Sequence, residues 1–200
     1  MAIEIIASGD ALGATVYGLS LADPPSDEVV TRIEEALEAH GVLVFPDQTI
    51  SPAEQVAFSR AFAELELTEL DRARLPGHEE IFVVGNVGKG LVSFAPAEEG
   101  GELEWHTDHI HLTVPARASL LYALEVPPTG GDTAFACLYC GFDALSPDEQ
   151  AHAVSACMKY ADSSGESAWG CWIGFTDEVQ EGGFMWADVS TATICRHAGV

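Results

Sequence analysis

One feature of the sequence constrains the fold most: the order of its short apolar runs, turns and helix signals. Extended runs at Ile3–Ile6, Ala14–Leu21 and Val42–Phe45 alternate with turn residues, which is typical of strands. Further runs of this kind lie at 81–84, 118–126 and 133–137. Strands outnumber helices, and helices do not separate every strand pair. The pattern predicts a mainly antiparallel β core with flanking helices, not a doubly wound parallel sheet.

Three helix starts are marked by capping residues. The segment 26–40 begins with Ser-Asp, has apolar residues at helical spacing and is followed by glycine, which predicts a helix over this range. Ser-Pro-Ala-Glu at 51–54 combines a capping box with proline at the first helical position, which predicts a helix over about 52–65. The similar Ser-Pro-Asp-Glu at 146–149 predicts a third helix.

The charge of the chain excludes several classes of partner. Eight Lys and Arg stand against 32 Asp and Glu, which leaves a net charge of −24. Such a surface repels phosphate backbones and anionic lipid, so we expect neither nucleic acid nor membrane as a partner. No apolar stretch approaches the ~20 residues of a spanning helix, and the first residues do not resemble a secretory signal. These features predict a cytoplasmic protein.

The number of cysteines also favours a cytoplasmic protein. Five is an odd number in a chain without an export signal, which favours reduced thiols. Cys137 and Cys140 have the CxxC spacing, but neither a second CxxC nor a Cys/His pair follows them. We therefore expect buried or half-buried thiols there rather than a structural zinc site.

The segment Trp105-His106-Thr107-Asp108 is the strongest chemical signal. On an extended chain, residues i and i+2 project to the same side, so His106 and Asp108 would lie together. One imidazole and one carboxylate are two of the three ligands in the 2-His-1-carboxylate triad that binds non-haem iron(II). An HxD pair alone is not specific, because such pairs are common in structural roles. Trp105 is expected to pack beside the pair.

Neighbouring motifs add specificity. Pro-Pro-Thr-Gly-Gly-Asp-Thr at 127–133 follows the Trp-His-Thr-Asp segment and an intervening strand. In order and spacing, these motifs resemble the taurine dioxygenase (TauD/TfdA) family of iron(II)- and 2-oxoglutarate-dependent dioxygenases. The run Gly-Val-Leu-Val-Phe-Pro-Asp-Gln at 41–48, the helix after it and Phe-Asp-Ala-Leu-Ser-Pro at 142–147 are similar to that family too. The resemblance covers about residues 8–155.

The resemblance implies a double-stranded β-helix (jelly-roll) core, in an α+β chain that is mainly β with flanking helices. It implies that His106 and Asp108 are the catalytic Fe(2+) ligands and that the Thr133 hydroxyl helps to hold the 2-oxoglutarate carboxylate. 2-Oxoglutarate would be converted to succinate while O2 oxidises a small-molecule organic substrate. Apart from the resemblance, Thr133 is a β-branched residue that opens a strand after a Gly-Gly turn.

The last third of the chain departs from the family pattern. The family has a distal histidine and, beyond it, an arginine that pairs with 2-oxoglutarate. After Asp108 this chain has only the following arginines and histidines: Arg117, Arg196, His109, His111, His152 and His197. No arginine follows His197. We interpret residues 1–157 as the N-terminal part of a dioxygenase domain and 158–200 as an atypical tail. The core would then be incomplete and the shortened chain inactive.

Two other functions are open at this stage. One is a zinc hydrolase built on the His106–His111 cluster, although His109 and His111 would point away from His106 and Asp108 on a strand. The other is a non-catalytic family member that keeps the fold. Residues that should line a taurine pocket correspond to Thr68 and Asp71, so taurine is not the expected substrate.

The tail also bears on assembly. If 158–200 does not supply the late strands, then Leu120, Tyr122 and Leu124 or their neighbours would meet solvent. An apolar face of that kind predicts either a homo-oligomer or a poorly behaved monomer. The residues expected to cover it are Trp169, Trp172 and Trp186.

Overall fold

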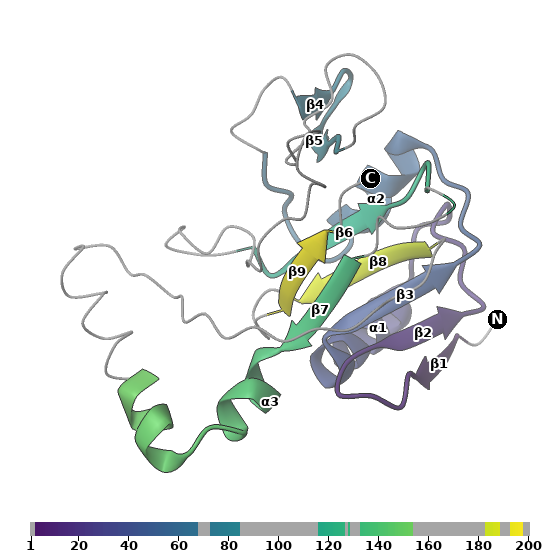
Figure 1. Ribbon diagram of the computed structural model, residues 1–200. Helices are drawn as coiled ribbons and strands as arrows, with labels where there is room; N and C mark the ends of the chain where they lie inside the picture. The colour runs from purple at the N-terminus through teal and green to yellow at the C-terminus, as the bar shows by residue number, and fades with distance from the viewer. Residues whose placement is uncertain are drawn as a thin grey trace.

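The computed structural model describes residues 3–67, 73–84, 116–126, 128, 133–153, 183–188 and 193–197. Its main sheet has five strands in the order β1-β2-β3-β8-β6 (Figure 1). The strands are β1 (Glu4–Ala7), β2 (Ala14–Tyr17), β3 (Val42–Pro46), β8 (Gly183–Asp188) and β6 (Ala118–Tyr122). β2 and β3 are parallel, and the other neighbouring pairs are antiparallel. The chain therefore has the mixture of strands and flanking helices that the sequence predicts.

Helix α1 (Asp27–His40) forms the connection between parallel strands β2 and β3, which a tight turn could not make. The Ser26 hydroxyl accepts a hydrogen bond from the Val29 N–H at 3.4 Å. At the other end, Gly41 has φ +69° and donates its N–H to the Leu37 carbonyl at 2.7 Å. A left-handed backbone suits glycine there, because glycine has no Cβ to clash. The predicted start and end of this helix are confirmed.

The hydrophobic core lies between α1 and the sheet. Ile33 on α1 and Leu43 and Phe45 on β3 are fully buried. They belong to one cluster that also includes residues of β2 and of the segment after it. Burying each such side chain contributes about 1.5 to 3 kcal/mol relative to leaving it exposed. The apolar periodicity of α1 and the compact strand 42–46 thus face the same core.

Helix α2 (Pro52–Arg60) starts as predicted but ends earlier than the expected residue 65. Its last turn tightens, since Ala61 N–H donates to Phe58 O at 3.1 Å and Phe62 N–H donates to Ser59 O at 3.2 Å. The Ser59 hydroxyl also donates to the Gln55 carbonyl at 2.8 Å. Such back-bonding by serine competes with the regular helical ladder and tends to bend helices. The predicted length was therefore wrong by about one turn.

Aromatic and ionic contacts attach α2 to its surroundings. The Phe58 ring lies edge-on to that of Phe45, with centroids 6.3 Å apart. It also contacts Phe62, with centroids 5.2 Å apart. Arg60 forms an ion pair with Glu80 on β5 (His78–Phe82). β5 pairs with β4 (Arg74–Leu75), so this small hairpin is tied to α2; the predicted strand 81–84 begins earlier than expected.

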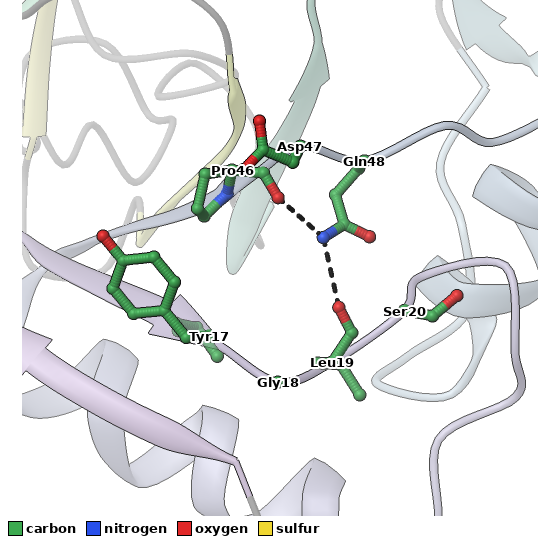
Figure 2. A pocket seen from close by; sticks show the side chains of 8 residues that line it. Tyr17, Gly18, Leu19, Ser20, Pro46, Asp47 and Gln48 are labelled. Carbon is green, nitrogen blue, oxygen red and sulfur yellow. Dashed lines mark hydrogen bonds between the residues drawn. The ribbon is translucent and has the colours of Figure 1, made fainter.

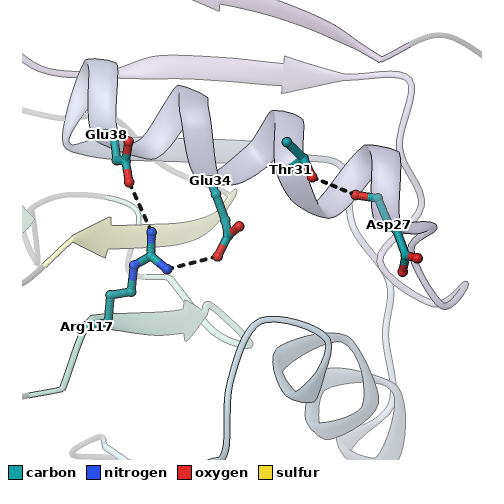
Figure 3. A network of polar contacts seen from close by, with 5 residues as sticks. All are labelled: Asp27, Thr31, Glu34, Glu38 and Arg117. Carbon is teal, nitrogen blue, oxygen red and sulfur yellow. Dashed lines mark hydrogen bonds and ion pairs between the residues drawn. The ribbon is translucent and has the colours of Figure 1, made fainter.

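An arginine clamp connects β6 to α1 (Figure 3). Arg117, just before β6, places one guanidinium nitrogen 2.9 Å from Glu34 and the other 3.2 Å from Glu38. The two glutamates lie four residues apart on the same side of α1, which is the spacing that lets both reach one cation. These side chains are substantially exposed, so the contact fixes orientation more than it adds stability.

Besides the β4–β5 hairpin, another two-stranded sheet pairs β7 (Thr133–Cys137) with β9 (Thr193–His197). β7 has the predicted bounds. The short helix α3 (Leu138–Asp143) follows it at once and was not predicted. The helical segment 147–153 begins after the predicted capping box, in which the Ser146 N–H donates to Glu149 at 2.9 Å.

Strands from the last part of the chain enter the main sheet and the β7–β9 pair. β8 lies between β3 and β6, with Leu43 opposite Trp186 and Leu120 also opposite Trp186. Leu120 and Tyr122 pack against the core cluster. Leu124, which follows the end of β6, is 79% exposed, because β6 stops at Tyr122 instead of reaching Val126. Part of 158–200 thus joins the main sheet, while the domain division at 157 stays a prediction.

The capping box of α2 makes stability depend on pH. Hydrogen bonds from the Ser51 backbone N–H first, and from its hydroxyl second, lower the pKa of Glu54 below its ordinary 4.5. The folded pKa lies below the unfolded one, so this contribution is present above the unfolded value. It is lost as pH falls through the lowered folded value. Ser51→Ala keeps the backbone N–H and removes the hydroxyl bonds with Glu54, so we expect it to reduce the urea midpoint of unfolding more at pH 7 than at pH 3.

Ser26→Ala is the matched control for this experiment. Ser26 also caps a helix, but Val29 occupies the position that Glu54 has in α2. Its loss should cost about 1 kcal/mol at both pH values. Equal pH dependence in the two variants would contradict the role given to Glu54.

Candidate functional site

The structure describes some of the predicted site residues and not others. His106 and Asp108 lie outside the described residues, as do Trp105, His109 and His111. Their roles as ligands or neighbours of a metal therefore remain predictions. Thr133 is described and half-buried. Within the described part of the chain, no group of three or more His, Cys, Asp or Glu side chains could hold a metal ion.

Thr133 is the first residue of β7. It lies opposite His197 in the antiparallel register, and its neighbour Ala134 lies opposite Arg196. The backbone therefore brings the late histidine and arginine to the same end of the β7–β9 pair as Thr133. Arg117, the other late arginine, already contacts Glu34 and Glu38 on α1.

A pocket opens at the ends of β2 and β3 (Figure 2). Its volume is about 350 Å³. Residues from two segments line it: Val16, Tyr17, Gly18, Leu19, Ser20, Pro46, Asp47 and Gln48. The two segments come together because β2 and β3 are parallel neighbours, so their C-terminal ends lie at the same edge of the sheet.

Gln48 joins the two segments of the pocket. Its amide nitrogen donates to the carbonyls of Leu19 at 3.1 Å and Pro46 at 2.9 Å. Its amide oxygen accepts the Leu21 N–H at 2.9 Å. One side chain thus satisfies three backbone groups that would otherwise need other partners. Figure 2 shows both donated bonds: the one to Leu19 crosses between the two segments, and the one to Pro46 stays within the turn that carries Gln48.

The turn that carries Gln48 is also bonded to β6. The Tyr122 hydroxyl donates to the Gln48 carbonyl and accepts the Ile50 N–H, both at 3.3 Å. Asp47 in this turn has φ +57°, a left-handed conformation that Asp tolerates better than most residues. The pocket contains the amide of Gln48, the phenol of Tyr17 and the carboxylate of Asp47. The described hydrogen bonds of Gln48 hold the ends of the strands in place, which is a structural role.

Sequence reasoning predicted a strand at 42–45 and matched the stretch 41–48 to a family motif, but it did not foresee the bonds of Gln48. Its partners Leu19 and Leu21 lie far back in the chain. No local spacing signals such a contact. A glutamine directly after a buried strand and a Pro-Asp turn was the available hint.

Comparison with known proteins decides the family. The family model described as "Taurine catabolism dioxygenase TauD, TfdA family" matches residues 4–180 of the chain. The chain belongs to the TauD/TfdA family. The matched range includes His106, Asp108 and Thr133, the three residues for which the sequence motifs predicted site roles. The family prediction is therefore confirmed, and its match extends beyond the residues 8–155 expected from the motifs.

Characterised relatives of this TauD/TfdA chain act on different compounds, as their names state. Pentalenolactone F synthase of Streptomyces avermitilis is 31% identical over 142 residues, covering 70% of this chain and 46% of that protein. The (S)-phenoxypropionate/alpha-ketoglutarate-dioxygenase of Delftia acidovorans is 31% identical over 160 residues, covering 76% and 51%. The alpha-ketoglutarate-dependent 2,4-dichlorophenoxyacetate dioxygenase of Cupriavidus pinatubonensis is 34% identical over 146 residues, covering 68% and 50%. The matches therefore span about half the length of these relatives.

Solved structures support the fold. A taurine dioxygenase from Burkholderia xenovorans superposes with a TM-score of 0.71 at 21% identity, covering 98% of this chain and 83% of that chain. AAD-2 in complex with Mn(II) and N-oxalylglycine superposes with a TM-score of 0.55 at 28% identity, covering 76% and 49%. The first likeness concerns the fold alone. No helix in the described part of the chain has the length and apolar content that a membrane span requires.

The role of Gln48 as a framework residue is testable by a near-isosteric change. In Gln48→Glu, a carboxylate oxygen takes the place of the amide nitrogen. This oxygen faces the Leu19 and Pro46 carbonyls and has no proton to donate to them. Leaving buried polar groups unpaired costs about 1 to 3 kcal/mol; these groups are half-buried, so we expect a loss of about 1 kcal/mol in the free energy of unfolding at pH 7. Chemical denaturation monitored by circular dichroism measures it.

Gln55→Glu supplies the control. Gln55 lies on α2, and no side-chain hydrogen bond of this residue is found among the described residues. The same change of charge should alter stability by less than about 0.5 kcal/mol there. Similar losses in the two variants would show that added negative charge, not the lost donor, explains the effect at Gln48.

Proposed function

We propose that this chain is part of an Fe(II)- and 2-oxoglutarate-dependent dioxygenase that uses O2 to oxidise a small organic substrate. The observation that carries the proposal is the family match over residues 4–180, which includes both halves of the His106-x-Asp108 motif and Thr133. Relatives named as alpha-ketoglutarate-dependent dioxygenases support the cosubstrate. The AAD-2 structure with Mn(II) and N-oxalylglycine supports a metal beside an oxalyl-type ligand.

The finer fold that we propose is a double-stranded β-helix. The five-stranded sheet and the separate β7–β9 pair supply two groups of strands from which such a core is built. The likeness to the Burkholderia xenovorans structure supports it. In this fold β7, which begins at Thr133, belongs to the strands that surround the site.

In the proposed site, His106 and Asp108 hold the metal and Thr133 holds the cosubstrate. A neutral imidazole and a carboxylate suit iron(II), and they leave coordination positions for other ligands. Iron(II), when bound with 2-oxoglutarate, supplies the activation of O2. The Thr133 hydroxyl can donate one hydrogen bond to a carboxylate. Its place at the head of a strand fixes its backbone through the pairing with His197.

The ligand assignment predicts which variants lose the metal. His106→Ala or Asp108→Ala should abolish iron(II) binding, because each removes a direct ligand. His109→Ala and His111→Ala should retain most of it. Isothermal titration with iron(II) under anaerobic conditions measures the affinity, and a visible charge-transfer band on adding 2-oxoglutarate reports the ternary complex. Equal loss from all four variants would instead favour the zinc-hydrolase cluster.

The role of Thr133 predicts a separate defect. A hydrogen bond to a charged group contributes about 1.5 to 3 kcal/mol, so Thr133→Ala should weaken 2-oxoglutarate binding roughly ten- to hundredfold. Iron(II) binding should stay near normal. Titration of 2-oxoglutarate into the iron-loaded protein, followed by the charge-transfer band, measures this.

Thr133→Ser is the matched control, since it keeps the hydroxyl and removes only the methyl group. It should bind 2-oxoglutarate nearly as well as the unaltered chain. If Thr133→Ser is as impaired as Thr133→Ala, the residue acts through β-strand packing rather than through its hydroxyl.

A further inference from the structure

The junction between β7 and α3 brings two cysteines together. Cys137 is the last residue of β7 and the N-cap of α3, and Cys140 lies in the first turn of that helix. The Cys140 N–H donates to the Cys137 Sγ at 3.2 Å. Both cysteines are free thiols; Cys137 is half-buried and Cys140 is exposed. The sequence expectation of buried or half-buried thiols thus holds for Cys137 and is wrong for Cys140.

The backbone spacing fits a disulfide. Helical geometry places Cα atoms three residues apart at about 5 Å. A disulfide accepts Cα separations of about 4.4 to 6.8 Å. Closing the bond would therefore need rotation of the two side chains and little movement of the backbone. The contact between the Cys137 sulfur and the Cys140 N–H shows that the first side chain already turns toward the second residue.

A metal site explains this pair less well. Structural zinc takes four ligands. The described residues contain no group of three or more potential ligands that includes these thiols. Two adjacent thiols with one exposed to solvent are instead suited to exchange with another disulfide.

We propose that Cys137 and Cys140 form a reactive dithiol that closes reversibly to an intramolecular disulfide by exchange with a small disulfide such as oxidised glutathione. In the first step, the Cys137 thiolate attacks one sulfur of the small disulfide, forming a mixed disulfide and expelling one thiolate. In the second, Cys140 loses its proton and attacks the Cys137 sulfur, expelling the second thiolate. The two cysteines are oxidised, and the small disulfide is reduced to two thiols.

The order of attack follows from the contacts of the two sulfurs. The side-chain hydrogen bond with Cys137 is the largest cause that raises the pKa of Cys140, and the nearby charges of Cys137 and Asp143 act in the same direction. Cys140 is the more exposed thiol, but it keeps its proton longer, which makes it the poorer first nucleophile. The Cys137 sulfur, by contrast, already accepts a hydrogen bond from the Cys140 N–H.

The test uses the full chain, reduced and then equilibrated in mixtures of reduced and oxidised glutathione. After acid quenching and alkylation of the remaining thiols, cleavage before aspartate yields the peptide 132–142, whose only cysteines are Cys137 and Cys140. We expect this peptide to lose two hydrogens and resist alkylation as the oxidised fraction rises, and to recover with dithiothreitol. Full alkylation at every ratio, or cross-links to Cys157, Cys171 or Cys195 instead, would overturn the proposal.

Single variants test the order of attack. Cys140→Ser should accumulate the mixed disulfide at Cys137 faster than Cys137→Ser accumulates it at Cys140. Both variants should keep the circular dichroism spectrum of the unaltered chain. In urea the two rates should become similar, because the contacts are lost. Equal rates in the folded variants would overturn the assignment of Cys137 as the first nucleophile.

Discussion

Burial of β3 is the constraint on which the rest of the structure depends. Leu43 and Phe45 are fully buried, so the strand cannot leave its own N–H and C=O groups without partners. β2 pairs along one edge and β8 along the other, while α1 covers a face. Residues from the start, middle and end of the chain are thereby brought to one strand. Any change that loosens β3 would separate all of them.

The turn after β3 positions the neighbouring elements through hydrogen bonds. Directly after it, the turn at 46–50 presents Gln48 to the loop after β2 and its own backbone to Tyr122 on β6. β6 is held a second time by Arg117, which contacts two glutamates of α1. β6 is therefore positioned at both of its ends, although the strand with which it pairs is β8.

Local signals predicted those features whose causes lie within about four residues. Caps at Ser26, Ser51 and Ser146 were readable, because a capping side chain bonds backbone only three positions ahead. Helix α3 was missed because its N-cap is Cys137, a residue type without a recognised capping preference. The place of β8 between β3 and β6 was not predictable, since strand order depends on contacts between distant segments.

For the candidate site, the sequence identified the residue types and their order along the chain. It did not show which strands bring these residues together. The HxD spacing predicts that His106 and Asp108 project together, and both lie outside the described residues. The strand start at Thr133 is confirmed. What brings Thr133 beside other groups is the pairing of β7 with β9, which no local pattern contains. The bonds of Gln48 were hidden for the same reason, because their partners are distant in sequence.

Each proposed site has one residue on β7, yet the two sites can fail independently. Thr133 and Cys137 are four residues apart on β7, so they project to the same face at a separation of roughly 13 Å. A disulfide to Cys140 would constrain the first turn of α3, beyond the last ladder pair between Cys137 and Thr193. The pairing of Thr133 with His197 at the opposite end does not depend on that turn. Oxidation of the dithiol should therefore leave the cosubstrate residue in place, and loss of the Thr133 hydroxyl should leave thiol exchange unaltered.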